Sequence, residues 1–131
     1  YRGEIADKIS SWMRSRKAPL VASDLRSYRV IERKPVVVDA LDHKIAVMPP
    51  PSSGGVVICQ ILNTLEGYPL KELGFRSAQA VHYQIEAMRH AYVDRNSYLG
   101  DPDYVKNPLE RLVSKDYAAT LRQGIDPARV V

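Results

Sequence analysis

Cysteine is nearly absent from this chain of 131 residues, which contains Cys59 and no other cysteine. An internal disulfide is therefore excluded, and with it a small fold held together by disulfides. Cys59 lies in an apolar stretch, which favours a buried, unreactive thiol over a nucleophile. Because a single cysteine says little about the redox compartment, it does not indicate where the protein works.

Long apolar runs and a strong net charge are also missing. No run approaches the ~20 residues of a membrane-spanning helix, so no span is expected in this chain. The net charge is +4, from 19 basic and 15 acidic residues, which is mild. The densest basic cluster, residues 14–17, lacks the motifs of nucleic-acid-binding proteins and suits a helix C-terminus. We therefore expect neither nucleic acid nor a membrane as a partner.

The first residue, Tyr1, stands directly in a helical pattern, without an initiator methionine or a signal peptide. The length suits one domain or a piece of a larger one. We therefore expect residues 1–131 to form a single partial domain of a longer protein. A localisation signal is not found in the chain, so its cellular location is unknown from these residues.

Amphipathic helices are predicted where apolar residues recur at helical spacing. The first covers residues 3–16 and is expected to place Trp12 in the core. The longest is expected to be capped by Ser77 and to run to about Tyr98, and a shorter one is expected after Ser114. The faces expected to pack inward consist of Ile5, Ile9, Trp12 and Met13 in the first helix, and of Val81, Ile85, Met88 and Tyr92 in the longest.

Between the first helix and the longest one, the periodicity changes to that of strands. The runs 36–41 and 44–48 are rich in β-branched residues and are separated by Asp42-His43, which predicts a β-hairpin. The break contains no glycine, so the type of turn stays open. The predicted fold class is therefore α/β (α+β), a helix-rich fragment with one β-hairpin.

A turn of three prolines, two serines and two glycines, residues 49–55, joins this hairpin to an almost continuously apolar helix at 56–65. The prolines exclude both a helix and a central strand. The serines and glycines that follow could leave free N–H groups at a helix N-terminus, where anions or carboxylates bind. A rigid connector that only packs is the favoured alternative. The residues that could bind an anion or a substrate carboxylate are Ser52, Ser53, Gly54 and Gly55.

Three potential metal ligands, His82, Glu86 and His90, recur every four residues on the longest helix and share one side of it. Such a row could bind zinc, but no fourth ligand is evident, and the same spacing is ordinary on a helix surface. We predict no metal and no cofactor. Asp94 and Arg95 close this helix before a turn rich in Gly, Asp and Pro, and we interpret them as a charge pair that holds that turn.

Taken together, these segments resemble the gamma-glutamyltransferase (gamma-glutamyltranspeptidase) family over nearly the whole chain. The most specific pair is the turn 49–55, followed later by Asp94-Arg95 and the segment 98–102. Lys17-Ala18 departs from the glycines that are common in the family, which affects a loop. Further matching segments are Tyr1–Ala6, Asp24-Leu25, Gln60–Asn63, Glu86-Ala87 and Ala91-Tyr92.

This resemblance implies part of an αββα N-terminal-nucleophile hydrolase. The resemblance also implies a precursor that cuts itself into a large and a small subunit. The new N-terminal threonine of the small subunit attacks a gamma-glutamyl amide such as glutathione, and the gamma-glutamyl group passes to water, an amino acid or a peptide. A free α-amine beside the threonine hydroxyl can act as its base.

By the same resemblance, this chain would be the C-terminal part of the large subunit. Its threonines, Thr64 and Thr120, lie inside predicted helices and outside the family's processing context. We therefore expect no catalytic residue here, and an inactive chain when it is isolated. The expected partners are the rest of the large subunit, the small subunit and, in the parent protein, a gamma-glutamyl substrate. Bacterial relatives imply a periplasmic or secreted location.

Two alternatives to this function stay open. The parent could be a related amidohydrolase of the cephalosporin-acylase type, because the groups that grip the substrate are expected outside this chain. The chain could instead be a stand-alone anion-binding module that uses the turn 49–55. In either case the apolar helix at 56–65 needs more cover than the other predicted elements provide, so the isolated chain is expected to self-associate.

Overall fold

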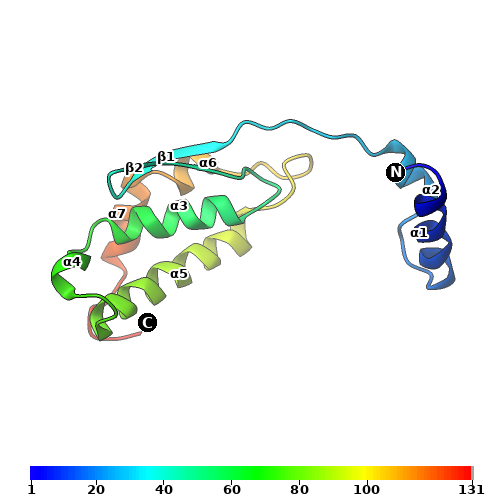
Figure 1. The fold of residues 1–131 in the computed structure, drawn as a ribbon. Coiled ribbons are helices and arrows are strands. Elements are labelled where there is room, and N and C mark those ends of the chain that lie inside the picture. Colours follow the sequence, from blue (N-terminus) through cyan, green and yellow to red (C-terminus); the bar gives the residue numbers. More distant parts are fainter. Residues whose placement is uncertain (131) are drawn as a thin grey trace. The chain divides into compact units, whose positions relative to one another are not determined.

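The computed structural model describes residues 1–130, and they fall into two compact units, Tyr1–Arg33 and a larger unit that begins at Lys34. The first unit contains α1 (Glu4–Ser15) and α2 (Ala22–Ser27), which contact each other. The second contains all the other elements drawn in Figure 1. That the whole chain belongs to a single partial domain stays a prediction.

In the first unit, α1 forms where the periodicity predicts it. The expected core around Trp12 is wrong within this unit, because its side chain is 57% exposed and that of Ile5 is 75% exposed. The buried residues of α1 are instead Ala6 and Ser10, one helical turn apart. Their short side chains allow close packing, whereas the six residues of α2 are too few to cover a large apolar face.

The predicted hairpin is confirmed. Strand β1 (Val36–Ala40) pairs antiparallel with β2 (His43–Val47), and Ala40 lies opposite His43. The connecting residues are Leu41 and Asp42, one position earlier than expected, so His43 begins a strand. Both connecting residues have positive φ, 52° and 63°, as in a type I′ turn, whose twist matches that of the paired strands.

The apolar helix after the proline turn, α3 (Gly54–Leu65), is the centre of the second unit. It contacts both strands of the hairpin and also α5 (Ala78–Tyr98), which runs alongside it (Figure 1). The prediction that most of its sides are covered is confirmed. Its buried residues are Gly55, Val56, Val57, Cys59, Gln60, Asn63, Thr64 and Leu65.

The longest helix, α5, begins as predicted, because the Ser77 hydroxyl accepts a hydrogen bond from the backbone N–H of Ala80 at 3.2 Å. Its predicted inward face is wrong. The two alanines Ala87 and Ala91 are buried instead, because their small side chains allow α3 to pack closely. The side chains predicted to be core are between 39% and 52% exposed, namely Val81, Ile85, Met88 and Tyr92.

Three shorter helices complete the second unit: α4 (Leu70–Leu73), α6 (Leu109–Leu112) and α7 (Lys115–Gln123). Helix α7 packs against α3 and α5. It is capped as predicted by Ser114, whose hydroxyl accepts from the N–H of Tyr117 at 3.1 Å. The helix-rich class with one hairpin is therefore confirmed. Across residues 1–130, none of the helices combines the length and the apolar character that crossing a bilayer requires.

The hairpin turn yields a stability prediction. Replacing Leu41 and Asp42 together by Asn and Gly should raise the free energy of unfolding by about 1 kcal/mol, because these residues favour positive φ at both positions of a type I′ turn. The backbone N–H of Leu41, which donates to Glu66 at 3.1 Å, is unchanged by the replacement. Urea unfolding followed by circular dichroism measures the effect. Leu41→Val, which disfavours positive φ, is the control and should lower stability.

Candidate functional site

Within the proline turn, Ser53 is the last residue before α3 begins. The Ser53 carbonyl accepts a hydrogen bond from the N–H of Val57 at 3.0 Å, which starts the helix. The Ser53 side chain does not cap the helix. Its hydroxyl instead accepts from the Arg95 guanidinium at 3.2 Å, so the end of α5 is joined to the start of α3.

The two glycines of this turn have different roles. A Cβ at Gly55 would collide with the carbonyl oxygen of Met48 and would lie 2.8 Å from a methyl carbon of Val47. Gly55 is therefore required for α3 to pack against the end of β2. A Cβ at Gly54 would meet nothing closer than the Ser52 hydroxyl, at 3.8 Å. Close packing thus explains one glycine and leaves the other free for a different role.

The buried carboxylate of Asp94 joins the three helices α3, α5 and α7. It lies on α5 with 6% exposure and accepts hydrogen bonds from the Gln60 side-chain amide of α3 and, at 3.1 Å, from the Tyr117 hydroxyl of α7. Burial raises the pKa of Tyr117, and the hydrogen bond to Asp94 raises it further. The guanidinium of Arg111 stacks 4.5 Å from the centre of the Tyr117 ring.

These contacts correct the interpretation of Asp94 and Arg95. Arg95 donates to Ser53 and, at 2.8 Å, to the side chain of its neighbour Asn96, while Asp94 faces α3 and α7. The turn after α5 is held instead by Asn107. Its side chain accepts from the N–H of Gly100 at 2.8 Å and donates to the Gly100 carbonyl at 3.0 Å. The pattern of the sequence predicted a structural role correctly but assigned it to the wrong partners.

The row of His82, Glu86 and His90 is not assembled as a ligand set. His82 is bonded through Nε2 to the backbone carbonyl of Asp126 at 2.8 Å. Glu86 is fully buried, and one of its oxygens lies 3.5 Å from the guanidinium of Arg89. In the part of the chain that the structure describes, no three residues among His, Cys, Asp and Glu are grouped so that they could hold a metal ion.

The two threonine hydroxyls make hydrogen bonds within their own helices, and the cysteine thiol is buried. Thr64 is fully buried and donates to the carbonyl of Gln60 at 2.8 Å, and Thr120 donates to that of Asp116 at 3.1 Å. Both hydroxyls thus make local helix contacts, which does not suit a nucleophile. Cys59 is fully buried, and burial raises the pKa of its thiol, which disfavours the reactive thiolate.

The turn 49–55 is the segment for which the sequence predicts a possible anion site. Ser52 and Gly54 are exposed beside the start of a twelve-residue helix, and the cationic side chain of Arg95 reaches Ser53. A helix N-terminus and a guanidinium both favour negative charge. That Ser52, Ser53, Gly54 and Gly55 bind an anion or a carboxylate stays a prediction.

Comparison with known families gives one match over the whole chain. The model of the gamma-glutamyltranspeptidase family matches residues 1–131. Among curated proteins, the glutathione hydrolase proenzyme of Pseudomonas sp. (strain A14) is 58% identical over 129 residues. This alignment covers 98% of the chain but 22% of the relative, so the chain spans less than a quarter of the length of that protein.

Solved structures give the same picture. A gamma-glutamyltranspeptidase of Helicobacter pylori matches with a TM-score of 0.91 and 41% identity, over 100% of this chain and 38% of the solved chain. A cephalosporin acylase of Bacillus halodurans matches with a TM-score of 0.83 and 31% identity, over 96% of this chain and 23% of the solved chain. Both relatives are therefore much longer than this chain, and their shared part has the same fold.

The close approach at the turn predicts unequal effects of two similar substitutions. Gly55→Ala should lower the free energy of unfolding by about 1–3 kcal/mol, because the new methyl group overlaps Met48 and Val47. Gly54→Ala, at the adjacent position, should change it by no more than about 1 kcal/mol. Denaturant unfolding of the two variants measures the difference. Equal losses would show that the packing of α3 on β2 does not require Gly55.

Substitutions of the two buried carboxylates of α5 should have different effects on the stability of the protein. Asp94→Asn should cost about 1–3 kcal/mol, because the carboxylate accepts two donors and the amide would turn a donor toward one of them. Glu86→Gln should be neutral or stabilising, since neither oxygen of Glu86 accepts a hydrogen bond within the described residues. Thermal unfolding at neutral pH tests the pair. A larger loss for Glu86→Gln would contradict this account.

Proposed function

Because this chain belongs to the gamma-glutamyltranspeptidase family, we propose that it is the C-terminal part of the large subunit of a glutathione-hydrolysing gamma-glutamyltransferase. The observation that carries the proposal is the high identity to a glutathione hydrolase proenzyme along nearly the whole chain. The parent protein would cleave gamma-glutamyl amides such as glutathione and transfer the gamma-glutamyl group to water, an amino acid or a peptide.

In this proposal the chain is part of the frame of the enzyme. The nucleophile is the N-terminal threonine of the small subunit, and the groups that bind the substrate come from segments outside these residues. The local hydrogen bonds of Thr64 and Thr120 support this division, because both hydroxyls are used within their own helices. The partners are the rest of the large subunit and the small subunit. The word proenzyme in the names of the relatives supports an origin in one precursor.

The hairpin would then belong to a larger sheet. We propose that β1 and β2 enter the αββα sandwich of the parent protein, with α3 in the helical layer on one of its faces. The contacts of α3 with both strands support this arrangement. Gly55 contributes to it because a side chain there would push α3 away from the end of β2.

A second candidate has specific support from the cephalosporin acylase similarity. Both activities break an amide, and the substrate-binding groups that would separate them are proposed to lie outside the chain. The parent protein would in that case prefer a side-chain amide of a β-lactam over a gamma-glutamyl amide. The two candidates are distinguished by assaying one enzyme preparation with a gamma-glutamyl anilide and with a β-lactam side-chain amide. The substrate with the higher kcat/KM indicates the correct candidate.

The activity test uses a gamma-glutamyl anilide and the parent precursor after processing. We expect turnover by the processed parent, and faster release of the aniline when an acceptor dipeptide is added. The chain 1–131, assayed at the same concentration, should release no aniline above the uncatalysed rate. Turnover by the isolated chain, or an acyl adduct on one of its side chains, would contradict the proposal that the nucleophile lies elsewhere.

A further inference from the structure

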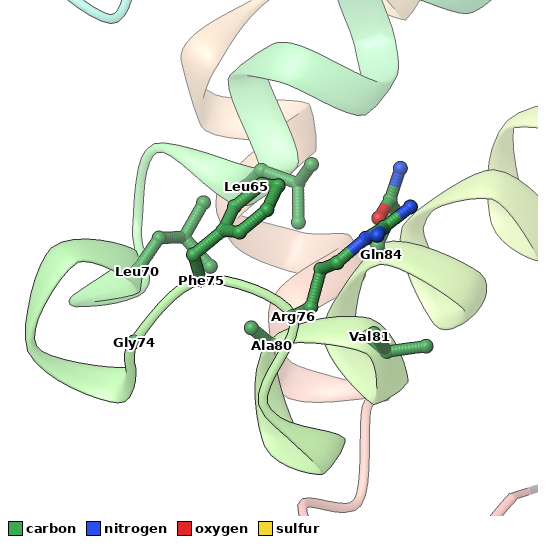
Figure 2. A pocket seen from close by; sticks show the side chains of 8 residues that line it. All are labelled: Leu65, Leu70, Gly74, Phe75, Arg76, Ala80, Val81 and Gln84. Atoms are coloured by element: carbon green, nitrogen blue, oxygen red, sulfur yellow. The ribbon is translucent and has the colours of Figure 1, made fainter.

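A hollow of about 200 Å³ lies where the end of α3, the short helix α4 and the start of α5 meet. All the residues that line it belong to the second unit, and they come from these three helices and from the loop that joins α4 to α5. Most of the lining is apolar, as Figure 2 shows, and it includes Leu65, Leu70, Phe75, Ala80 and Val81. We call this feature the α4–α5 hollow.

The size and the lining of the α4–α5 hollow suit a single aromatic ring. A dry protein cavity of about 150 Å³ with Leu, Ile and Phe in its walls is large enough to bind benzene. The α4–α5 hollow has a similar lining and is somewhat larger. The side chain of Phe75 is 94% exposed, so its ring is open to a partner. A second ring packed against Phe75 would remove apolar surface from water on both sides of the contact.

Two polar side chains also line the hollow, that of Arg76 from the loop and that of Gln84 from α5. Figure 2 shows the polar ends of both on the same side of the hollow, opposite Leu70. The guanidinium of Arg76 lies 5.5 Å from the centre of the Phe75 ring. Among the described residues, neither polar side chain makes a hydrogen bond or an ion pair. Their donors are therefore open to a ligand.

The charge of the hollow favours an anion. No Asp or Glu is among the described residues that line it, so the guanidinium of Arg76 gives the lining a positive charge. A guanidinium presents two parallel N–H donors to a carboxylate, and the amide of Gln84 adds a further donor. One guanidinium balances one negative charge, which favours a carboxylate over a dianionic phosphate.

The backbone of Arg76 is a further indication of a binding role. Its φ is +59°, a conformation that costs free energy for a residue with a Cβ atom and that glycine adopts readily. Residues held in such conformations occur often at ligand-binding sites. At this position the conformation goes together with a guanidinium at an apolar hollow.

We propose that the α4–α5 hollow binds a small aromatic carboxylate, in which a short chain joins a single ring to the carboxylate group. The ring packs against Phe75, Leu65 and Leu70, and the carboxylate accepts hydrogen bonds from Arg76 and Gln84. This site goes beyond the proposed function, because one unit of this chain builds it, whereas the reacting groups of the proposed enzyme come from other segments.

The test is a titration of the full-length protein that contains this chain with 3-phenylpropanoate, followed by saturation-transfer NMR of the ligand. We expect a dissociation constant of about 1 mM or tighter, which is in the range for so small a ligand. Two control ligands separate the two halves of the site. 3-Phenylpropanamide lacks the charge and propanoate lacks the ring, and each should bind at least about fivefold more weakly. Absence of binding by 3-phenylpropanoate, or equal binding of the three ligands, would overturn the proposal.

Substitutions assign the binding to this hollow. Arg76→Gly removes the guanidinium and suits the positive φ, and Ala80→Leu places a larger side chain in the hollow. Each should raise the dissociation constant of 3-phenylpropanoate at least about fivefold. Lys71→Gln removes the same charge from an exposed position of α4 outside the lining, and should change the constant less than about twofold.

A dissociation constant that either hollow variant leaves unchanged would place the ligand elsewhere and overturn the proposal. Circular dichroism of the variants verifies that they keep the fold of the parent protein. The titration does not depend on turnover of a gamma-glutamyl anilide. A protein that binds 3-phenylpropanoate in this way but cleaves no anilide would therefore contradict the proposed function alone.

Discussion

The buried carboxylate of Asp94 is the constraint on which the larger unit depends. Withdrawing a carboxylate from water costs free energy, which hydrogen-bond donors offset, and for Asp94 the donors come from two other helices. Gln60 of α3 and Tyr117 of α7 meet it from different directions, so α3, α5 and α7 must pack in one arrangement. The neighbouring Arg95 extends the same junction to the proline turn by donating to Ser53.

The central helix α3 connects this junction to the hairpin. It packs against the two strands on one side and against α5 and α7 on others, and Gly55 permits its close approach to β2. The turn 49–55 is therefore first a structural connector, as the favoured interpretation of its residues has it. This role agrees with a chain that supplies a frame, while the reacting groups of the proposed enzyme come from other segments of the precursor.

The two sides of α5, one lined by alanines and one by large apolar residues, explain why the prediction of its inward face was wrong. The periodicity of Val81, Ile85, Met88 and Tyr92 correctly predicts an apolar face. It does not predict which neighbour covers that face, and within this unit α3 packs against the alanine side instead. The same holds for α1, where Ile5, Ile9 and Trp12 are exposed while Ala6 and Ser10 are buried. Small residues allow helices to approach closely, a property that a hydrophobic pattern does not contain.

The sequence by itself determined the helix-rich class, the hairpin, the serine caps of α5 and α7, and the family, because all of these depend on local backbone preferences or on short motifs. The tertiary structure alone decided which faces are buried, which residues Asp94 and Arg95 contact, and that Asn107 holds the turn after α5. These contacts join residues far apart in the chain, such as Gln60 and Asp94, and their energy depends on how helices pack in three dimensions.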